Sequence, residues 1–225
     1  MKYDKAHEHD RVRRIIALLE KATQDMGNPM SEQIAQEYNR DPYLILISCL
    51  LSLRSRDVQT YKVVKDLFQY IKTPQEAVEF PLRKLESIIH SIGFYRRKAR
   101  LIKEVSQDLI NRFHGKVPDN EEDLLSLPGV GRKTSSLVLG VAFGIPAICV
   151  DTHVHRVTNR LGIVKTKNTA ETEIELKKII PKNKWIELNR LFVLWGQNIC
   201  VPISPKCSQC VLSPICPKIG VTRRR

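Results

Sequence analysis

The sequence has no apolar run long enough to span a membrane, and its first residues, Met1-Lys2-Tyr3-Asp4-Lys5, lack the apolar core of a signal peptide. These absences exclude a membrane-spanning protein and predict an intracellular one. Acidic residues are also scarce: 24 Asp and Glu stand against 37 Lys and Arg, and the net charge is +13. Such an excess favours a polyanionic partner, because a basic protein releases counterions from phosphates. A membrane surface is the competing partner, and we prefer nucleic acid.

Alternating strand patterns are absent, and no low-complexity linker marks a domain boundary. Apolar residues recur instead at helical spacing, so the sequence predicts an all-α protein. Asp41, Asp57 and Asp151 are expected to cap helices, and Asn120 leads into another. The main predicted helices cover residues 9–26, 43–53, 73–80, 81–92, 95–115, 137–143, 151–162, 169–180 and 184–199.

The stretch Leu127-Pro128-Gly129-Val130-Gly131-Arg132-Lys133-Thr134 predicts a tight turn that enters a helix. Pro128 favours the start of a turn, and Gly129 and Gly131 allow backbone angles and close approaches that a Cβ would block. Such a turn points backbone N–H groups outward at a helix N-terminus, where they can hold a phosphate. An ordinary glycine-rich turn with two solvated cations is the alternative.

Lys133 and Asp151 are candidates for catalysis. A neutral lysine amine can attack a carbonyl-like or glycosidic carbon, and a carboxylate near it can move a proton or stabilise developing positive charge. Each residue also has a simpler role: Lys133 as a phosphate contact, and Asp151 as a plain N-cap. His153 either contacts a phosphate or covers a helix face, because too few acidic or histidine residues accompany it to suggest a metal site.

The six cysteines are not spread as a disulfide framework. Cys49 and Cys149 lie in apolar runs and are expected to be inert core residues. The other four form the run Cys200-x6-Cys207-x2-Cys210-x5-Cys216. Four thiolates so close together suit either a tetrahedral zinc site or an iron–sulfur cluster, and the spacing alone leaves both open.

The hairpin stretch, the segment Val150-Asp151-Thr152-His153 and the four-cysteine run together resemble the endonuclease III family of DNA glycosylase/AP lyases, in the helix-hairpin-helix superfamily. The resemblance covers nearly the whole chain. It implies base-excision repair of double-stranded DNA: Lys133 would attack C1′ of an oxidised pyrimidine nucleotide, with Asp151 as the catalytic carboxylate. Loss of the base would leave a Schiff base, and β-elimination would break the strand 3′ to the abasic site.

The same resemblance implies a monomer that works with the DNA, in the cytoplasm or nucleoid. It implies two helical domains that flank a DNA-binding cleft, with Lys133 and Asp151 facing each other across it and the damaged base leaving the duplex to enter it. Residues 31–145 would form a six-helix barrel that carries the helix-hairpin-helix motif. Residues 1–30 and 146–225 would form a discontinuous cluster domain, with a 4Fe-4S cluster held by Cys200, Cys207, Cys210 and Cys216.

DNA contacts are expected from two loops as well as from the hairpin. Phe94 would act as an apolar wedge in the space that the extruded base leaves, with core packing as the alternative. Arg54 stands where the commonest family pattern has glutamine, a departure that bears on the choice of opposite base. The full expected contact set is Leu127, Gly129, Gly131, Arg132, Arg54, Phe94 and His153.

Two other functions stay open. One is a thymine or uracil glycosylase of the same superfamily, against which Lys133 argues, because some of those relatives carry tyrosine at that position. The other is a non-catalytic helix-hairpin-helix module that only binds DNA, in which Lys133 and Asp151 would have no reason to occur together.

Overall fold

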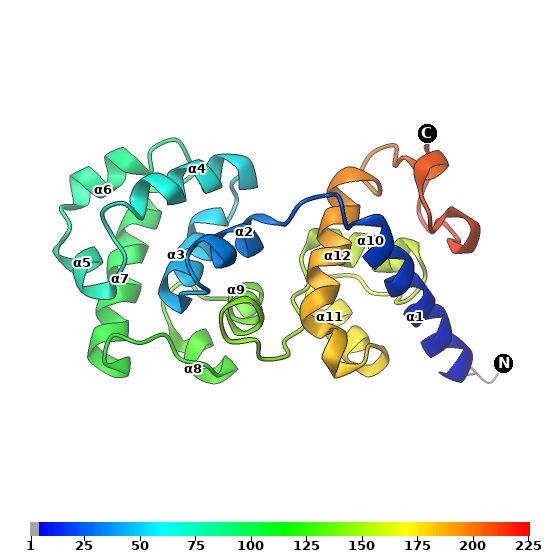
Figure 1. Cartoon of the computed structure of the whole chain (residues 1–225), viewed down its shortest axis with the longest axis horizontal. Helices are drawn as coiled ribbons and strands as arrows, with labels where there is room; N and C mark the ends of the chain where they lie inside the picture. Colours follow the sequence, from blue (N-terminus) through cyan, green and yellow to red (C-terminus); the bar gives the residue numbers. More distant parts are fainter. Residues whose placement is uncertain (1–4) are drawn as a thin grey trace. The chain divides into compact units, whose positions relative to one another are not determined.

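The structure is a computed structural model that describes residues 5–225, so the first residues, where no signal-peptide core was expected, lie outside it. Every regular element within this range is a helix, and the all-α prediction is confirmed. The described chain forms two compact units, one from Met30 to Ile145 and the other joining the segment that ends at Pro29 to Pro146–Arg225 (Figure 1). No helix in residues 5–225 is both long and apolar enough to cross a membrane.

The Met30–Ile145 unit is organised around α3 (Pro42–Ser52), in which every residue from Tyr43 to Leu51 is buried. Asp41 caps this helix as predicted: its Oδ1 accepts a hydrogen bond from Leu44 N at 3.0 Å. α3 packs against α2, α4, α7 and α9, which explains why its sequence is apolar on all sides. The other helices of the unit are α2 (Met30–Glu37), α4 (Asp57–Leu67), α5 (Pro74–Glu79), α6 (Leu82–Ile88), α7 (Tyr95–Phe113), α8 (Glu121–Ser126) and α9 (Arg132–Leu137).

The prediction that Asp57 caps a helix is wrong. α4 begins at Asp57, and the N-cap is Arg56, whose backbone is extended and whose side chain makes no capping bond. The tight turn before it, closed by Ser55 N donating to Ser52 O at 3.0 Å, brings the chain into the helix one residue earlier than expected. Asp57 therefore lies in the first turn of α4, where a carboxylate still favours the helix dipole.

The apolar run after the hairpin is helical, but not uniformly α-helical. α9 ends at Leu137, and Val138–Ala142 continues as a π-helix, η1. A π-helical segment carries an extra residue in the turn and is frequent beside functional sites. Here it lies directly behind the hairpin and packs against α3.

The second unit has its core between α1 (Lys5–Ala22), α10 (Thr152–Arg160) and α12 (Trp185–Asn198). Ile15 and Leu19 of α1, Val154 of α10, and Leu191 and Phe192 of α12 are buried together in this core. The unit also contains α11 (Thr169–Ile179) and three short 3-10 helices, η2 (Lys182–Lys184), η3 (Cys207–Gln209) and η4 (Ser213–Ile215).

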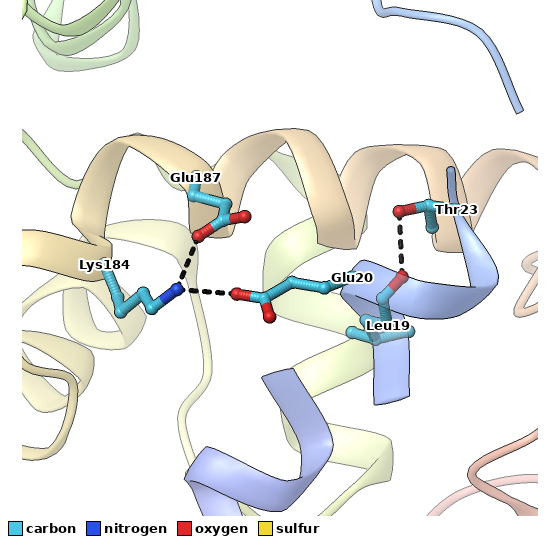
Figure 2. Close-up of polar contacts among 5 residues, drawn as sticks. All are labelled: Leu19, Glu20, Thr23, Lys184 and Glu187. Atoms are coloured by element: carbon cyan, nitrogen blue, oxygen red, sulfur yellow. Dashed lines mark hydrogen bonds and ion pairs between the residues drawn. The ribbon is translucent and has the colours of Figure 1, made fainter. Parts of the chain in front are cut away.

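An ion pair joins the two ends of this discontinuous unit. Lys184 Nζ donates to Glu20 Oε1 of α1 at 2.6 Å and to Glu187 Oε2 of α12 at 2.9 Å (Figure 2). The hydrogen bond from Lys184 lowers the pKa of Glu20, and the bonds to Glu20 and Glu187 raise the pKa of Lys184. Both side chains of the Glu20–Lys184 pair are about one third exposed, so water weakens the interaction.

Candidate nucleic-acid interface and cysteine site

The hairpin runs from α8 through the turn Leu127–Gly131 into α9. Asn120 caps α8, with its Oδ1 accepting from Asp123 N at 2.9 Å, and Val130 N donates to Leu127 O at 3.2 Å to close the turn. Leu127 as a whole is only 2% exposed, and its N–H and C=O are bonded within the turn, to Leu124 O and Val130 N, so this residue supports the turn, whereas Gly129 and Gly131 are exposed. The turn is thus anchored from below by an apolar side chain and presents main chain at the surface.

The two glycines of the turn, Gly129 and Gly131, differ in backbone angle and in the space around them. Gly129 has φ +70°, and a Cβ there would lie 2.7 Å from Leu101 Cδ2, so both the backbone angle and the packing require glycine. Gly131 has φ −106°, an ordinary value, and a Cβ there would meet nothing within 4 Å. Nothing inside the protein demands glycine at 131, and the space beside it is open.

Gly131 is also the N-cap of α9, and no side chain caps this helix end. The next two residues, Arg132 and Lys133, are exposed cations in the first turn of α9. Lys133 lies near α3: burial raises the pKa of the Cys49 thiol to about 11, and the charge of Lys133 acts in the opposite direction. A helix that begins with glycine and carries two cations in its first turn suits an anionic ligand. The expected burial of Cys49 and Cys149 is confirmed.

Asp151 caps α10, as the sequence predicted. Its Oδ1 accepts hydrogen bonds from His153 N at 2.8 Å and from Val154 N at 2.9 Å, and its side chain is half-buried. These two hydrogen bonds satisfy N–H groups in the first turn of α10. The cap holds the carboxylate in one orientation at the end of a rigid helix.

The ring of His153 is held by Arg156, whose Nη2 lies 3.1 Å from His153 Nδ1. A guanidinium can only donate, so Nδ1 accepts and the ring proton of a neutral His153 is on Nε2. Arg156 also donates to the carbonyl oxygens of Gly196 at 2.8 Å and Cys200 at 3.0 Å. Gly196 leaves no room for a Cβ, which would lie 2.9 Å from His153 Nδ1. α10 is therefore clamped to the end of α12 and to the first cysteine of the run.

Cys200, Cys207, Cys210 and Cys216 line one cavity, together with Arg160, Lys206 and Lys218. All four are free thiols. Arg160 Nη1 lies 3.5 Å from Cys200 Sγ, and Lys218 N donates to Cys216 Sγ at 3.3 Å. Burial raises the pKa of Cys210, and the backbone of Leu212 and the indole N–H of Trp195 act in the opposite direction. Among the side chains of residues 9–225, no group of three or more Cys, His, Asp or Glu is arranged around a single metal ion.

Arg54 and Phe94 come from separate loops and meet at the surface. The guanidinium carbon Cζ of Arg54 lies 5.8 Å from the centroid of the Phe94 ring, within the range of a cation–π contact. Phe94 is 60% exposed, so the alternative of core packing for this residue is wrong. Both residues have left-handed backbone angles, with φ +54° at Arg54 and +59° at Phe94.

Sequence reasoning missed Lys98, which is only 6% exposed. Its Nζ donates to Leu51 O at 2.8 Å and to Ser55 Oγ at 2.9 Å, and burial lowers its pKa to about 8. A signal was present: Lys98 lies one helical turn before Ile102, on the apolar face of α7 that continues through Val105.

Comparison with known proteins identifies the family. Residues 47–182, more than half of the chain, match the model of the HhH-GPD superfamily base excision DNA repair protein. Endonuclease III of Thermotoga maritima is 48% identical over 196 residues, which cover 85% of this chain and 92% of that protein. Endonuclease III of Bacillus subtilis is 40% identical over 177 residues, which cover 78% of this chain and 81% of the relative.

Solved structures agree. A trapped endonuclease III–DNA covalent intermediate superposes with a TM-score of 0.84 at 38% identity, covering 93% of this chain and 96% of that one. A thermostable thymine-DNA glycosylase superposes with a TM-score of 0.83 at 27% identity, covering 96% of this chain and 98% of the other. The chain belongs to the helix-hairpin-helix superfamily of base excision DNA repair proteins and, within it, to the endonuclease III family of DNA glycosylases and AP lyases, as its sequence motifs predicted.

Proposed function

We propose that the protein removes oxidised pyrimidines from double-stranded DNA and cleaves the resulting abasic site, with Lys133 as the nucleophile. The observation that carries this proposal is the exposed amine of Lys133 in the first turn of α9, directly after an uncapped helix start. Backbone N–H groups there can hold a phosphate while the neighbouring lysine is presented to the nucleotide. A protein with this activity works where the genomic DNA is, in the cytoplasm or nucleoid.

In the proposed reaction, the neutral amine of Lys133 attacks C1′ and the glycosidic bond to the base breaks. Nζ then loses a proton, and the sugar ring opens as the C1′–O4′ bond breaks and O4′ takes a proton, which gives a Schiff base between Nζ and C1′. Removal of a C2′ proton allows β-elimination, which breaks the C3′–O bond and leaves the strand cut 3′ to the abasic site. Arg132, beside the nucleophile, contributes positive charge toward the backbone phosphates.

Asp151 supplies the carboxylate of this reaction. Its Oδ1 is held by two backbone N–H groups, which keep the side chain oriented. An ionised carboxylate can stabilise the positive charge that develops on the sugar as the base leaves, and can accept a proton in the later steps. Capping and catalysis are therefore compatible roles for the same side chain.

Cys200, Cys207, Cys210 and Cys216 would hold a 4Fe-4S cluster. Four free thiols share one cavity without converging on a single ion, which suits a group wider than one zinc atom. The cations Arg160, Lys206 and Lys218 around the cavity would offset thiolate charge, and a cluster sulfur would offer an acceptor to the indole N–H of Trp195. When bound, such a cluster supplies a covalent crosslink between α12 and the C-terminal segment.

The remaining DNA contacts follow from exposure and chemistry. The backbone of Gly129 and Gly131 and the side chain of Arg132 would contact phosphates, and the buried Leu127 would support the turn that presents them. His153 Nε2–H is a further donor available to a phosphate oxygen, because Arg156 occupies Nδ1. Arg54 and Phe94 would contact the base stack.

Borohydride trapping tests the proposal. The wild type should form a covalent adduct with a thymine-glycol duplex and with an abasic duplex, because borohydride reduces the Schiff base. Lys133→Gln should form none while still binding DNA and unfolding at the wild-type temperature. Lys116→Gln removes an exposed lysine of the same unit outside the hairpin, and should be trapped as the wild type is.

Two outcomes would overturn the assignment. An adduct with Lys133→Gln would mean that another amine is the nucleophile. Absence of an adduct with the wild type, despite binding, would favour the non-catalytic DNA-binding module. A duplex with thymine opposite guanine distinguishes the mismatch glycosylase, to which the 27%-identical thymine-DNA glycosylase structure gives weight.

A further inference from the structure

Lys98 is a buried cation that the chemistry of base removal does not use. It lies in the first turn of α7, and only 6% of it is exposed. Burial of an ammonium group costs free energy unless its hydrogen bonds are replaced. Both acceptors that replace them, Leu51 O and Ser55 Oγ, belong to the segment that carries Arg54. The position of Lys98 thus concerns the Arg54 loop.

The first acceptor is the end of a helix. Leu51 is in the last turn of α3, where carbonyl oxygens lack partners within the helix. An ammonium group at 2.8 Å satisfies one of these oxygens and opposes the negative end of the helix dipole. The second acceptor, Ser55 Oγ at 2.9 Å, lies on the other side of Arg54. The ammonium group of Lys98 therefore donates hydrogen bonds to this loop on both sides of Arg54, to Leu51 and to Ser55.

The backbone of Lys98 is hydrogen-bonded to the loop that carries Phe94. Phe94 is the N-cap of α7, and Lys98 N donates to Phe94 O at 3.0 Å. A Cβ on the preceding residue, Gly93, would lie 3.4 Å from Arg54 O, so the two loops are already packed closely. One residue thus connects Phe94 through its main chain with the flanks of Arg54 through its side chain.

The hydrogen bonds of Lys98 surround two residues, Arg54 and Phe94, whose backbone conformations are unfavourable. Arg54 and Phe94 both adopt left-handed backbone angles, which are unfavourable for residues with a Cβ. Their side chains nevertheless remain exposed and lie within cation–π range of each other, with Arg54 Cζ 5.8 Å from the Phe94 centroid. Strain that persists at an exposed pair requires support from the structure around it.

We propose that Lys98 is a positioning residue that presents Arg54 and Phe94 as one preassembled stacked pair, which enters the base stack as a unit when the damaged base leaves. This inference rests on the proposed function. A flat guanidinium on an aromatic ring offers two stacking surfaces, and Arg54 adds donors without acceptors for the unpaired base. Preassembly avoids ordering two long side chains at the moment of extrusion.

The test is Lys98→Met, which keeps an unbranched side chain of similar length and removes the donor. Stopped-flow fluorescence of 2-aminopurine placed beside a thymine glycol follows disruption of the base stack. We expect Lys98→Met to slow the fluorescence change and the single-turnover rate of base removal at least about tenfold, the effect of losing hydrogen bonds from a charged donor. Ser55→Ala removes only one of the two acceptors of Lys98 and should slow both rates less than Lys98→Met does. This variant provides the test if Lys98→Met does not fold.

The matched control is Lys103→Met on the same helix. Lys103 Nζ also donates to a backbone carbonyl, Val78 O, at 2.7 Å, but away from the two loops. Lys103→Met should leave the rate of the fluorescence change and the single-turnover rate of base removal within about twofold of wild type, because it acts at a site independent of the two loops. In the background Arg54→Ala/Phe94→Ala, Lys98→Met should have no further effect, because the pair that it positions is gone.

Two results would overturn the inference: wild-type rates for both Lys98→Met and Ser55→Ala, or an undiminished effect of Lys98→Met in the Arg54→Ala/Phe94→Ala background. The second result would assign Lys98 to general stability of α3 and α7. Trapping of the wild type on an abasic duplex is scored separately, so failure of this inference leaves the nucleophile assignment intact.

Discussion

Asp151 and His153 are joined at the start of α10, where the Asp151 carboxylate oxygen Oδ1 accepts a hydrogen bond from the backbone N–H of His153 at 2.8 Å. The same bond serves capping and the orientation of the carboxylate. Separating these two roles requires a change that keeps an acceptor at the cap and removes the charge. Asparagine meets this requirement, because it caps helices as well as aspartate does.

We therefore predict that Asp151→Asn slows single-turnover base removal by about 10²–10⁴-fold, the usual contribution of a positioned acid–base group. Its free energy of unfolding should change by less than about 1 kcal/mol, because the cap persists. Asp41→Asn is the matched control, an N-cap aspartate at the start of α3, and should leave the rate unchanged. If Asp151→Asn weakens DNA binding by as much as it slows turnover, Asp151 is only a structural cap.

The hairpin glycines should separate stability from DNA binding. Gly129→Ala forces a Cβ against Leu101 at a left-handed backbone angle, and should lower the free energy of unfolding by about 1–3 kcal/mol. Gly131→Ala meets no protein atom within 4 Å, and should cost about 1 kcal/mol or less as an N-cap change. We expect Gly131→Ala instead to weaken DNA binding in fluorescence anisotropy, because its Cβ would occupy the space of a phosphate. Wild-type affinity for Gly131→Ala would remove the turn from the interface.

The helix caps show which features of the fold could be predicted from the sequence. The caps at Asp41, Asn120 and Asp151 were predictable, because capping depends on residues two or three positions away. The prediction of a cap at Asp57 failed because Arg56, with its extended backbone, is the N-cap of α4. The turn from Ser52 to Ser55 at the end of α3 brings the chain into the helix one residue early. The π-helical turn at Val138–Ala142 has no local signal in an apolar run.

Contacts between distant residues were harder to predict. The motif spacing singled out Lys133, Asp151 and the four cysteines as candidate site residues, but it could not show that Arg54 contacts Phe94. That contact depends on two left-handed residues and on a tie across 47 positions of sequence, from Lys98 to Leu51. A lysine on the apolar face of a predicted helix was the available clue.

The positive charge of the chain should make DNA binding steeply dependent on salt. Each phosphate contact made by Lys or Arg adds close to one unit to the slope of log K against log salt concentration. We predict that Arg132→Ala lowers affinity for damaged and undamaged duplexes alike and reduces this slope by about 1. Anisotropy titrations across a range of NaCl concentrations measure it. A slope that is flat for the wild type would contradict the electrostatic account of binding.

The four-cysteine cavity should hold iron rather than zinc. We predict roughly four iron atoms and four inorganic sulfides per chain in protein purified without oxygen, with visible absorption near about 400 nm. Cys210→Ser should lose iron and absorption together, whereas Cys49→Ala, outside the run, should keep both. Removal of iron should lower the unfolding temperature, because the cavity joins the end of α12 to the C-terminal segment. Stoichiometric zinc in place of iron would show that the cavity holds a different metal.

The Glu20–Lys184 pair gives the second unit a specific response to acid. The hydrogen bond from Lys184 lowers the pKa of Glu20 in the folded protein below its ordinary value of 4.5. The folded state therefore binds this proton less readily than the unfolded state does. The resulting stabilisation is complete above the ordinary pKa and is lost as the pH falls through the lowered one.

We predict that Glu20→Gln lowers the free energy of unfolding at neutral pH by less than about 1 kcal/mol, because the pair is partly exposed and Glu187 still accepts from Lys184. The difference from wild type should shrink toward zero as the pH falls through the lowered pKa of Glu20, because Glu20 is then protonated in both states. Glu175→Gln, which breaks an exposed pair with Lys178 within α11, should have a smaller effect at neutral pH. Urea unfolding at several pH values measures both variants, and a difference for Glu20→Gln that grows in acid would contradict the lowered pKa.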